Sequence, residues 1–278
     1  MRHRVGYRIC TAAALLRVRL RPMQLLMPSE SGLSYRSAAQ RARLASEAWG
    51  EANLYCCNCD CLSLRPCAPN SEAIDFTCPT CAATFQLKSQ RTRLSGRIVD
   101  AAYGAMCRAI IENRTPNLVA LHYDADTWRV RNALLVPRFT FSLSVIEERK
   151  PLASTARRAG WVGCNILLDR IPNDAKIPLI EEGVVAQVAS VRRRYALLRP
   201  LEALNAEARG WTLDVLRVVR SIGVKRFDIA DVYAHEVELQ GLHSGNFHVR
   251  AKIRQQLQRL RDLGFLTFLG NGKYGMRR

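Results

Sequence analysis

A cysteine-containing hairpin is predicted from residues 73–89, which read AIDFTCPTCAATFQLKS. The pattern predicts one strand at Ala73–Cys78 and a second at Ala83–Ser89. The segment between them holds a proline and two closely spaced cysteines, which favours a tight turn. The two strands would therefore lie side by side, with the turn held in place by whatever the cysteines bind.

Two Cys-x-x-Cys pairs in this region predict a structural zinc site. Eighteen residues separate the pairs, a spacing typical of four-cysteine zinc sites because each turn directs two thiolates at one tetrahedral ion. A disulfide or a redox-active pair is the alternative, and neither explains why there are two pairs. The best ligand set is Cys56, Cys59, Cys78 and Cys81, although Cys57, Cys61 and Cys67 could each replace a neighbour. The remaining thiols, interpreted as a tail residue and two buried apolar residues, are Cys10, Cys107 and Cys164.

Three polar residues of the hairpin form a candidate catalytic group. Asp75 lies on the first strand, whereas Gln86 and Lys88 lie two residues apart on the second strand and so share a face. Hydrolysis of a phosphodiester needs oxygen ligands for Mg²⁺ and a cation near the attacking nucleophile. Asp75 and Gln86 would supply the oxygens and Lys88 the cation. The alternative is that all three are solvent-facing residues of a half-exposed hairpin.

The elements around the hairpin follow the order of a compact α/β domain with a mixed sheet. The pattern predicts helices at Ser37–Trp49 and Ile98–Asn113, and strands at Asn117–Tyr123, Arg129–Pro137 and Ile177–Glu181. The fold class predicted for this part of the chain is therefore α/β, with the zinc hairpin near its start.

Positive charge is unevenly distributed along the 278 residues. The chain has 42 Lys or Arg and 24 Asp or Glu, a formal net charge of +18, and its 48% hydrophobic content excludes intrinsic disorder. Residues 1–22 hold six arginines and no acid, residues 23–208 carry a net charge of +5, and residues 209–278 carry +7. An excess of this size in a folded chain indicates a polyanionic partner.

The arginine-rich start is predicted to be an extension outside the fold, residues 1–26. Its apolar stretch is eight residues long and lacks a small-residue cleavage site, which argues against a secretory signal; a transit peptide fits the composition better. We favour a third explanation, in which translation starts at Met23 or Met27. No stretch approaches the roughly 18 apolar residues that span a bilayer, so a soluble, cytoplasmic protein is expected.

The last 70 residues predict a winged-helix domain. Apolar periodicity indicates helices at Thr212–Ile222, Ile229–Leu239 and Phe247–Leu263, followed by a hairpin at Phe265–Tyr274. The apolar stripe of the third helix consists of Val249, Ile253, Leu257 and Leu260. Its outward side carries side chains suited to bases and phosphates, namely Arg250, Arg254, Gln255, Gln258 and Arg261, and Lys273 lies on the wing. The alternatives to DNA binding are a solvated basic face and a protein-docking module.

The hairpin resembles the active-site hairpin of PD-(D/E)xK nucleases, and specifically that of the DpnI-type methyl-directed (type IIM) restriction endonucleases. The similarity rests on Ala73–Cys78 and Phe85–Ser89 and continues in the same order along about residues 27–278. Further matching blocks are Ala39–Arg43 with Glu47 and Trp49, Lys150–Ala153, Thr155–Trp161, Gly163–Ile166, Arg209–Thr212 and Lys252–Gln258.

This resemblance implies a Mg²⁺-dependent endonuclease that cuts double-stranded DNA containing N6-methyladenine, in a GATC context. Asp75, the Gln86 side chain and the Leu87 carbonyl would then bind Mg²⁺, and Lys88 would orient or deprotonate the attacking water. The family has Glu where this chain has Gln86, which removes a negative charge and is expected to weaken metal binding. Glu47 is a candidate compensating acid, and the alternative is an exposed helix carboxylate.

Recognition of the methyl group requires an apolar wall, because the N6-methyl of adenine projects into the major groove. Trp161 lies between two glycines and is the candidate, with Arg157 and Arg158 on the backbone phosphates. The alternative is a tryptophan of the core.

The sequence thus predicts three parts: the extension 1–26, a nuclease domain with a zinc site at 27–204, and a winged-helix domain at 205–278. We expect a monomer in solution that acts on adenine-methylated duplex DNA. Two other functions stay open, a methyl-DNA reader that binds but cuts poorly or not at all, and a zinc-containing winged-helix transcription regulator.

Overall fold

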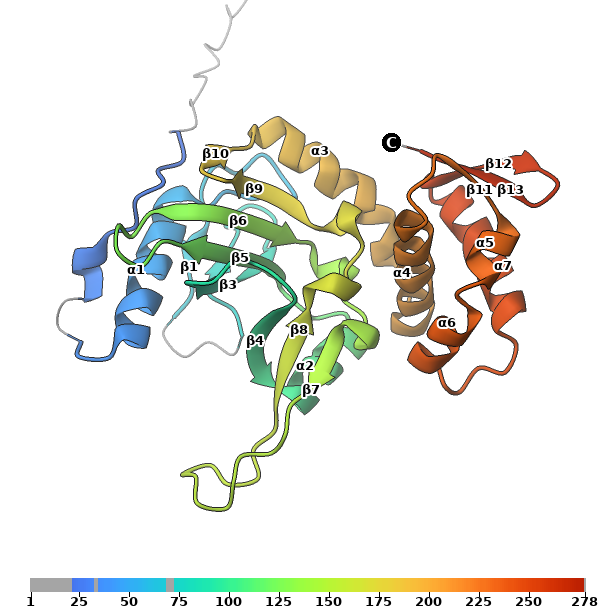
Figure 1. Cartoon of the computed structure of the whole chain (residues 1–278). Coiled ribbons are helices and arrows are strands. Elements are labelled where there is room, and N and C mark those ends of the chain that lie inside the picture. Colours follow the sequence, from blue (N-terminus) through green and yellow to red (C-terminus); the bar gives the residue numbers. More distant parts are fainter. Residues whose placement is uncertain (1–21, 33–34, 69–72, 278) are drawn as a thin grey trace, which may run out of the picture.

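The computed structural model of the protein describes residues 22–32, 35–68 and 73–277 (Figure 1). Residues 1–21, most of the expected extension and Cys10 with it, lie outside the described residues. The first described residues already contact the folded domain, since the Leu25 carbonyl accepts a hydrogen bond from the Val130 N–H at 2.7 Å. The Met27 N–H donates to the Trp128 carbonyl at 2.9 Å.

Helices and strands alternate along the first two thirds of the chain, and helices predominate in the last third. The helices are α1 (Ala38–Asn53), α2 (Tyr103–Ile111), α3 (Val188–Leu198), α4 (Ala206–Ser221), α5 (Ile229–Tyr233), α6 (Glu236–Leu242) and α7 (Val249–Asp262). The strands are β1 (Arg65–Pro66), β2 (Phe76–Thr77), β3 (Thr84–Gln90), β4 (Arg97–Ala102), β5 (Asn117–Tyr123), β6 (Val130–Val136), β7 (Ile146–Glu148), β8 (Gly163–Leu167), β9 (Ile177–Glu181), β10 (Val184–Val185), β11 (Arg226–Asp228), β12 (Leu266–Gly270) and β13 (Lys273–Met276).

A seven-stranded mixed sheet is the centre of the α/β part of the described chain. Its strand order is β1-β2-β3-β5-β6-β9-β10. β3 and β5 run parallel, and the other neighbouring strands of this sheet run antiparallel. The central strand β5 is buried at six of its seven positions, which accounts for its largely apolar sequence. The predicted α/β class with a mixed sheet is confirmed.

The hairpin at residues 73–89 forms, with a shorter first strand than predicted. Ala73 has φ of 56° and so cannot belong to a strand, and β2 covers only Phe76–Thr77. α1 packs against the hairpin at Gly50, where an added Cβ would lie 2.7 Å from the Phe76 ring. Glycine is therefore required at that helix position for the helix and hairpin to approach so closely.

The predicted helix Ile98–Asn113 is wrong in its first part, because residues 97–102 form β4 and the helix α2 begins at Tyr103. Burial alternates along β4, with Ile98 and Asp100 inside and Val99 outside, which is the period of a strand. β4 belongs to a separate sheet of order β4-β8-β7. The sequence reasoning did not predict β7 or β8, nor the helix α3 that covers β9.

A long loop, residues 149–162, connects β7 to β8. It extends away from the body of the molecule at the bottom of Figure 1. Residues 151–155 and 157–160 of this loop are exposed. The loop carries both Arg157 and Arg158, as well as Trp161.

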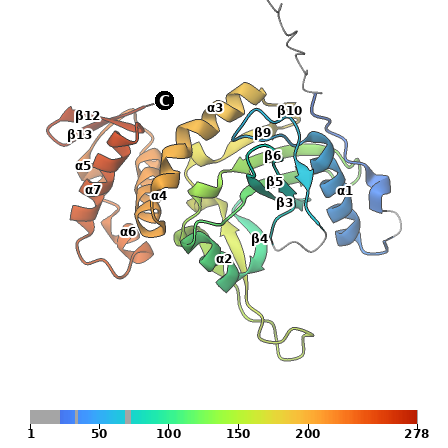
Figure 2. The same cartoon turned by 180° about the vertical axis from the view of Figure 1, so that it is seen from behind.

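The C-terminal part combines α4–α7 with a small antiparallel sheet of order β11-β13-β12 (Figure 2). The predicted third helix and the predicted hairpin are present as α7 and β12-β13. The predicted helix at Ile229–Leu239 is broken into α5 and α6, because His235 between them leaves helical geometry, with φ −97° and ψ 16°. The apolar stripe predicted for the third helix is buried as expected.

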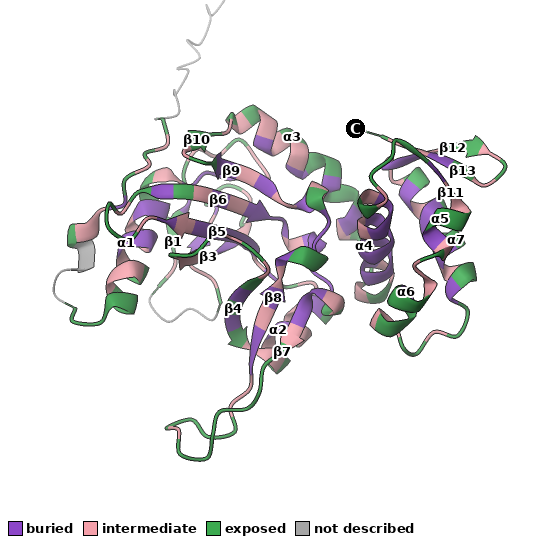
Figure 3. Cartoon of the chain, in the orientation of Figure 1, coloured by how far each residue is buried: buried purple, intermediate pink, exposed green. Residues whose placement is uncertain are grey.

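α4 lies between the two parts of the molecule, and most of its residues are buried (Figure 3). Its Arg209 side chain donates to the carbonyls of Phe141 and Ile110 in the α/β part. Arg220, near its other end, forms two hydrogen bonds with the Asp174 carboxylate, at 2.8 and 2.7 Å. The two parts therefore share one polar interface. Among the described residues, no helix is both long and apolar enough to cross a membrane.

Candidate functional site

The four cysteines predicted as zinc ligands lie together. The Sγ atoms of Cys56, Cys59, Cys78 and Cys81 are all within 4.8 Å of one another, with 3.6 Å separating Cys56 from Cys81 and Cys59 from Cys78. Backbone N–H groups two residues onward point at Cys56 and Cys78, as each Cys-x-x-Cys turn requires. Four converging thiols are the donor set of a tetrahedral zinc site. This cluster can therefore hold zinc.

Neither Cys57 nor Cys61 belongs to the four-thiol cluster of the described residues. Cys57 is buried, and burial is the main cause that raises the pKa of its thiol. The Cys61 thiol donates to the Ser63 carbonyl at 3.1 Å. At Cys81, burial acts to raise the pKa, but hydrogen bonds from Asn58 and the Ala83 backbone outweigh it and lower the pKa to about 7. Burial is the main cause that raises the pKa of Cys56 and Cys78, so Cys81 ionises more readily than these two thiols.

Arg192 joins the cysteine turns to helix α3. Its guanidinium donates to the carbonyls of Cys56 and Cys61, both at 3.0 Å, and lies 5.7 Å from the centre of the Tyr55 ring. The sequence did not single out this arginine. It holds the cluster, and with it the hairpin, against the helix that covers β9.

Asp75 is held at the start of the hairpin by the backbone of the facing strand. Its Oδ2 accepts a hydrogen bond from the Leu87 N–H at 2.6 Å, and its own N–H donates to the Phe85 carbonyl at 2.9 Å. The N–H and C=O of one strand residue point to the same edge. The Leu87 carbonyl therefore faces the edge at which Asp75 lies. Burial raises the pKa of Asp75, the Glu47 carboxylate adds to the rise, and the Leu87 N–H opposes both.

Gln86 and Lys88 share a face of β3, as predicted, and both reach the same third residue. The Gln86 Nε2 lies 3.1 Å from Asp100 Oδ1, and the Lys88 Nζ lies 2.7 Å from the same oxygen. Asp100 is on the buried face of β4. The sequence reasoning missed it because residues 98–113 were assigned to one helix. No signal in the sequence marks this strand, because the apolar Val99 is exposed and the polar Asp100 is buried, so polarity does not alternate along β4.

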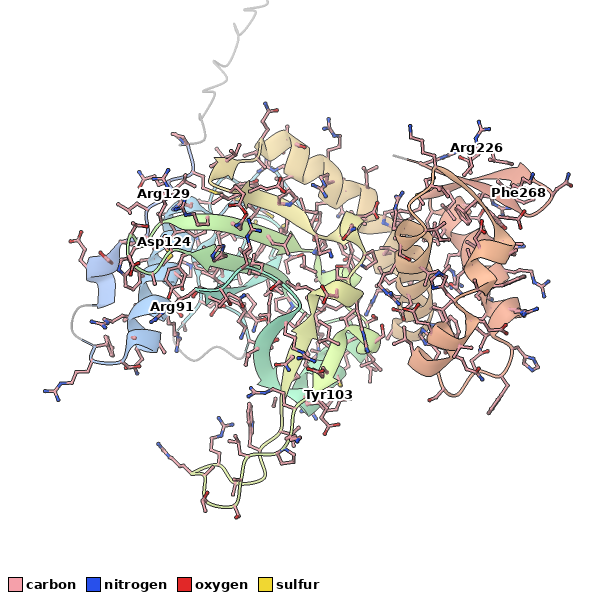
Figure 4. The ribbon with its side chains drawn as sticks, in the orientation of Figure 1. Arg91, Tyr103, Asp124, Arg129, Arg226 and Phe268 are labelled. Atoms are coloured by element: carbon pink, nitrogen blue, oxygen red, sulfur yellow. The ribbon has the colours of Figure 1, made fainter. Side chains whose placement is uncertain are left out.

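An open pocket of about 780 Å³ brings the predicted catalytic residues together. Asp75, Gln86, Leu87 and Lys88 all line it, as does Arg91, which is labelled in Figure 4. The remaining lining residues come mainly from α1 and β3. The pocket thus offers a carboxylate, an amide oxygen and a backbone carbonyl beside an ammonium group. Oxygen donors of this kind suit Mg²⁺, so the residues present fit a catalytic metal.

Glu47 also lines this pocket, on α1. Its Oε1 accepts a hydrogen bond from Arg43 Nε at 2.6 Å, and the two form an i, i+4 ion pair. The carboxylate is therefore near Asp75, yet its charge is compensated by its own helix.

The predicted methyl-binding tryptophan is not part of the core. Trp161 is half-buried at the base of the 149–162 loop, and its ring covers Gly163, where an added Cβ would lie 2.8 Å from the ring. The Arg158 guanidinium lies over the Trp161 ring, with its carbon 4.8 Å from the ring centre. Arg157 is exposed.

All the residues predicted to contact DNA from α7 are exposed on the outward face of the helix. These are Arg250, Arg254, Gln255, Gln258 and Arg261, and Lys273 on β13 is exposed as well. Arg250 pairs with Glu236 at 2.7 Å, and Arg261 pairs with the neighbouring Asp262. Phe247, just before α7, is 83% exposed, an unusual placement for a phenylalanine. It lies two residues before the helix end that enters the major groove in helix-turn-helix proteins.

Two family models match the chain. The first, DpnI, described as the Dam-replacing family, matches residues 23–203. The second, DpnI_C, described as the Dam-replacing HTH domain, matches residues 207–276. Together they span the α/β part and the C-terminal part, with the junction immediately before α4.

Proposed function

The chain belongs to the Dam-replacing family, whose members include methyl-dependent restriction endonucleases, and from this premise we propose its substrate and mechanism. The substrate is double-stranded DNA that contains N6-methyladenine in a GATC context, and the reaction is Mg²⁺-dependent hydrolysis of a phosphodiester bond. The observation that carries the proposal is the common pocket of Asp75, Gln86 and Lys88.

Each residue of the pocket has a role that follows from its chemistry. Asp75, the Gln86 Oε1 and the Leu87 carbonyl would hold Mg²⁺, which when bound polarises the phosphate and lowers the pKa of water. Lys88, on the same face of β3, orients the attacking water and offsets the negative charge that develops on the phosphate. The four cysteines keep β2 and β3 in register beside this pocket by holding zinc.

Two surfaces would bind the DNA. The α7 face and Lys273 provide base and phosphate contacts from the C-terminal part, and Arg157 and Arg158 provide phosphate contacts from the loop. Trp161, which is half-buried, and Phe247, which is exposed, are the aromatic residues that would contact the N6-methyl group, one from each part. An apolar contact of this kind discriminates a methylated from an unmethylated base.

The decisive test digests plasmid DNA from adenine-methylating and non-methylating hosts, with Mg²⁺ and with EDTA. We expect cleavage of methylated DNA that stops in EDTA. Lys88→Ala should abolish cleavage and leave binding of methylated DNA largely intact. Cleavage that is unchanged in EDTA would refute the metal mechanism, and unchanged cleavage by the variant would remove Lys88 from the site.

One observation favours a second candidate, a methyl-DNA reader. The PD-(D/E)xK nucleases have a carboxylate at the position of Gln86, which offers only an uncharged amide oxygen. A neutral ligand binds Mg²⁺ less strongly than a carboxylate does. Binding of methylated DNA without cleavage, at any Mg²⁺ concentration, would support the reader.

A further inference from the structure

Asp100 is a buried carboxylate that contacts two residues lining the pocket, Gln86 and Lys88, but is not itself a lining residue. Its side chain is 2% exposed, and it lies on the inner face of β4 beside Ile98. A charge in such a position is strongly unfavourable unless charged or hydrogen-bonding partners compensate it. β4 is also irregular here, because its pairing with β8 shifts register between Asp100 and Ala102. Register shifts of this kind often redirect a side chain beside a functional site.

The partners of Asp100 are two residues of the proposed catalytic group. Its Oδ1 accepts from the Gln86 amide and from the Lys88 ammonium. Because an ionised carboxylate can only accept hydrogen bonds, the nitrogen of the Gln86 amide must face Asp100. The Gln86 oxygen therefore faces away from Asp100, and it accepts no hydrogen bond from the side chains and backbone that the structure describes.

We propose that Asp100 is a positioning residue, which orients the Gln86 amide and the Lys88 ammonium from behind the pocket. It fixes the Gln86 amide with its oxygen directed at the metal position, and it holds the Lys88 ammonium beside that oxygen. This inference rests on the proposed nuclease function, and it explains why glutamine serves at position 86. A glutamate there would face Asp100 with a like charge and would lose the amide donor.

Exchange of the two polar groups tests the proposal. The variants are Asp100→Asn, Gln86→Glu and the double variant that combines them, in which an amide at position 100 donates to a carboxylate at position 86. The first readout is the single-turnover cleavage rate of methylated duplex DNA against Mg²⁺ concentration. The second readout is Mn²⁺ affinity of the free protein by isothermal titration calorimetry, which needs no catalysis.

Each single substitution should lower Mn²⁺ affinity and the cleavage rate about ten- to hundredfold, the usual effect of removing a group that orients a metal ligand. The double variant should recover most of that loss, because it restores one carboxylate, one amide and one hydrogen bond between them. A residue that only packs β4 would not show this recovery. Glu147→Gln is the matched control: it removes a carboxylate charge that pairs with Arg97 in the same small sheet, and it should leave both readouts unchanged.

Three results would overturn the inference. These are unchanged Mn²⁺ affinity and rate in Asp100→Asn, a rate in Gln86→Glu above that of the wild type, and a double variant no better than the weaker single variant. A wild-type protein that binds Mn²⁺ but cuts no methylated DNA would contradict the proposed function alone. In that case, weaker Mn²⁺ binding by Asp100→Asn still supports the positioning role, and equal binding overturns it.

Discussion

Trp161 and Phe247 both lie outside the core, Trp161 half-buried at the base of its loop and Phe247 83% exposed. Trp211, by contrast, is 2% exposed and stacks on His243 with ring centres 3.8 Å apart. Aromatic rings offer a large apolar face, and tryptophan is enriched at binding interfaces. At this scale the proposal for methyl recognition depends on two side chains.

Trp161→Ala should reduce the preference for methylated over unmethylated DNA about tenfold, because the apolar wall for the methyl group is removed, at a cost of about 1–3 kcal/mol. Binding to both DNAs, measured by fluorescence anisotropy, gives the ratio. Thermal stability should be almost unchanged, whereas Trp211→Ala, the matched control, should unfold the protein at a much lower temperature. An unchanged ratio in Trp161→Ala would contradict a methyl contact by this residue.

Phe247→Ala should also lower the preference for methylated over unmethylated DNA, because it removes an aromatic contact made by the C-terminal part. The reason is that Phe247 precedes α7, whose first turn would enter the major groove. The same anisotropy measurement applies, with Val237→Ala as the control, since Val237 is similarly exposed but lies on α6. Equal preference in the wild type and Phe247→Ala would show that the C-terminal part reads no methyl group through this ring.

Single residues were predictable where local sequence determines their position. Asp75, Gln86 and Lys88 were placed on one hairpin because strand periodicity and Cys-x-x-Cys spacing are local signals. Their assignment as a catalytic group rests on the family resemblance and stays a prediction. Asp100 was missed because its contacts come from a strand of a different sheet, and because the alanines that follow it favour a helix. A residue whose role depends on a long-range contact leaves no local pattern.

At the scale of elements, the two strands of the hairpin make few hydrogen bonds to each other. β2 pairs with β3 at only two positions, Phe76 with Phe85 and Thr77 with Thr84. A two-stranded ribbon of this length is not stable in water without further support. β3 is supported by its parallel pairing with β5, whereas β2 relies on the short strand β1, the four thiols and the contact of α1 at Gly50, so the position of Asp75 depends on these contacts.

Cys78→Ser should therefore abolish cleavage and lower the free energy of unfolding by on the order of several kcal/mol, since zinc binding contributes directly to folding. Zinc content by atomic emission and urea unfolding by circular dichroism measure the two effects. Cys67→Ser is the matched control, because Cys67 is a half-buried cysteine that lies outside the four-thiol cluster. A Cys78→Ser protein with wild-type zinc content and stability would rule out this metal centre.

The elements themselves were predicted well where one face is apolar and the other polar. α7 matches its predicted position closely because it has a clear helical period. β9 matches its predicted bounds as a short, largely apolar run. The irregular segments were not predicted: β4 runs directly into α2, and α5 and α6 are separated by a short break at residues 234–235. Such junctions are determined by packing against neighbours, which a single sequence does not display.

At the scale of the whole molecule, α4 connects the two parts through buried polar groups. Arg209 is fully buried, and its guanidinium donates to the carbonyls of Phe141 and Ile110 and to the Asn113 side chain. Burial lowers the pKa of this guanidinium, but all its partners are acceptors and it remains charged. The interface could not be predicted, because it joins residues about 100 positions apart.

Arg209→Ala should leave several buried acceptors unpaired and lower the free energy of unfolding by about 4 kcal/mol. Urea unfolding followed by circular dichroism checks the value. Arg193→Ala, on the exposed side of α3, is the matched control and should change stability by less than about 0.5 kcal/mol. If Arg209→Ala is as stable as this control, the interface does not hold the two parts together.

The excess positive charge gives the last prediction, which concerns both parts acting on one duplex. Binding of cations to DNA phosphates releases counterions, so the slope of log affinity against log salt falls by about 0.9 for each contact removed. Replacing Arg157 and Arg158 with Gln should reduce the slope by about 1.8, and replacing Arg254 and Lys273 with Gln should do the same. When both pairs are replaced, the two reductions should add, provided that the loop and the α7 face contact the same DNA molecule.

Anisotropy titrations at several salt concentrations measure these slopes, and replacement of Arg193 and Arg199 on the other side of the α/β part provides the control. If replacing either pair leaves the slope unchanged, the surface that carries that pair does not contact the duplex.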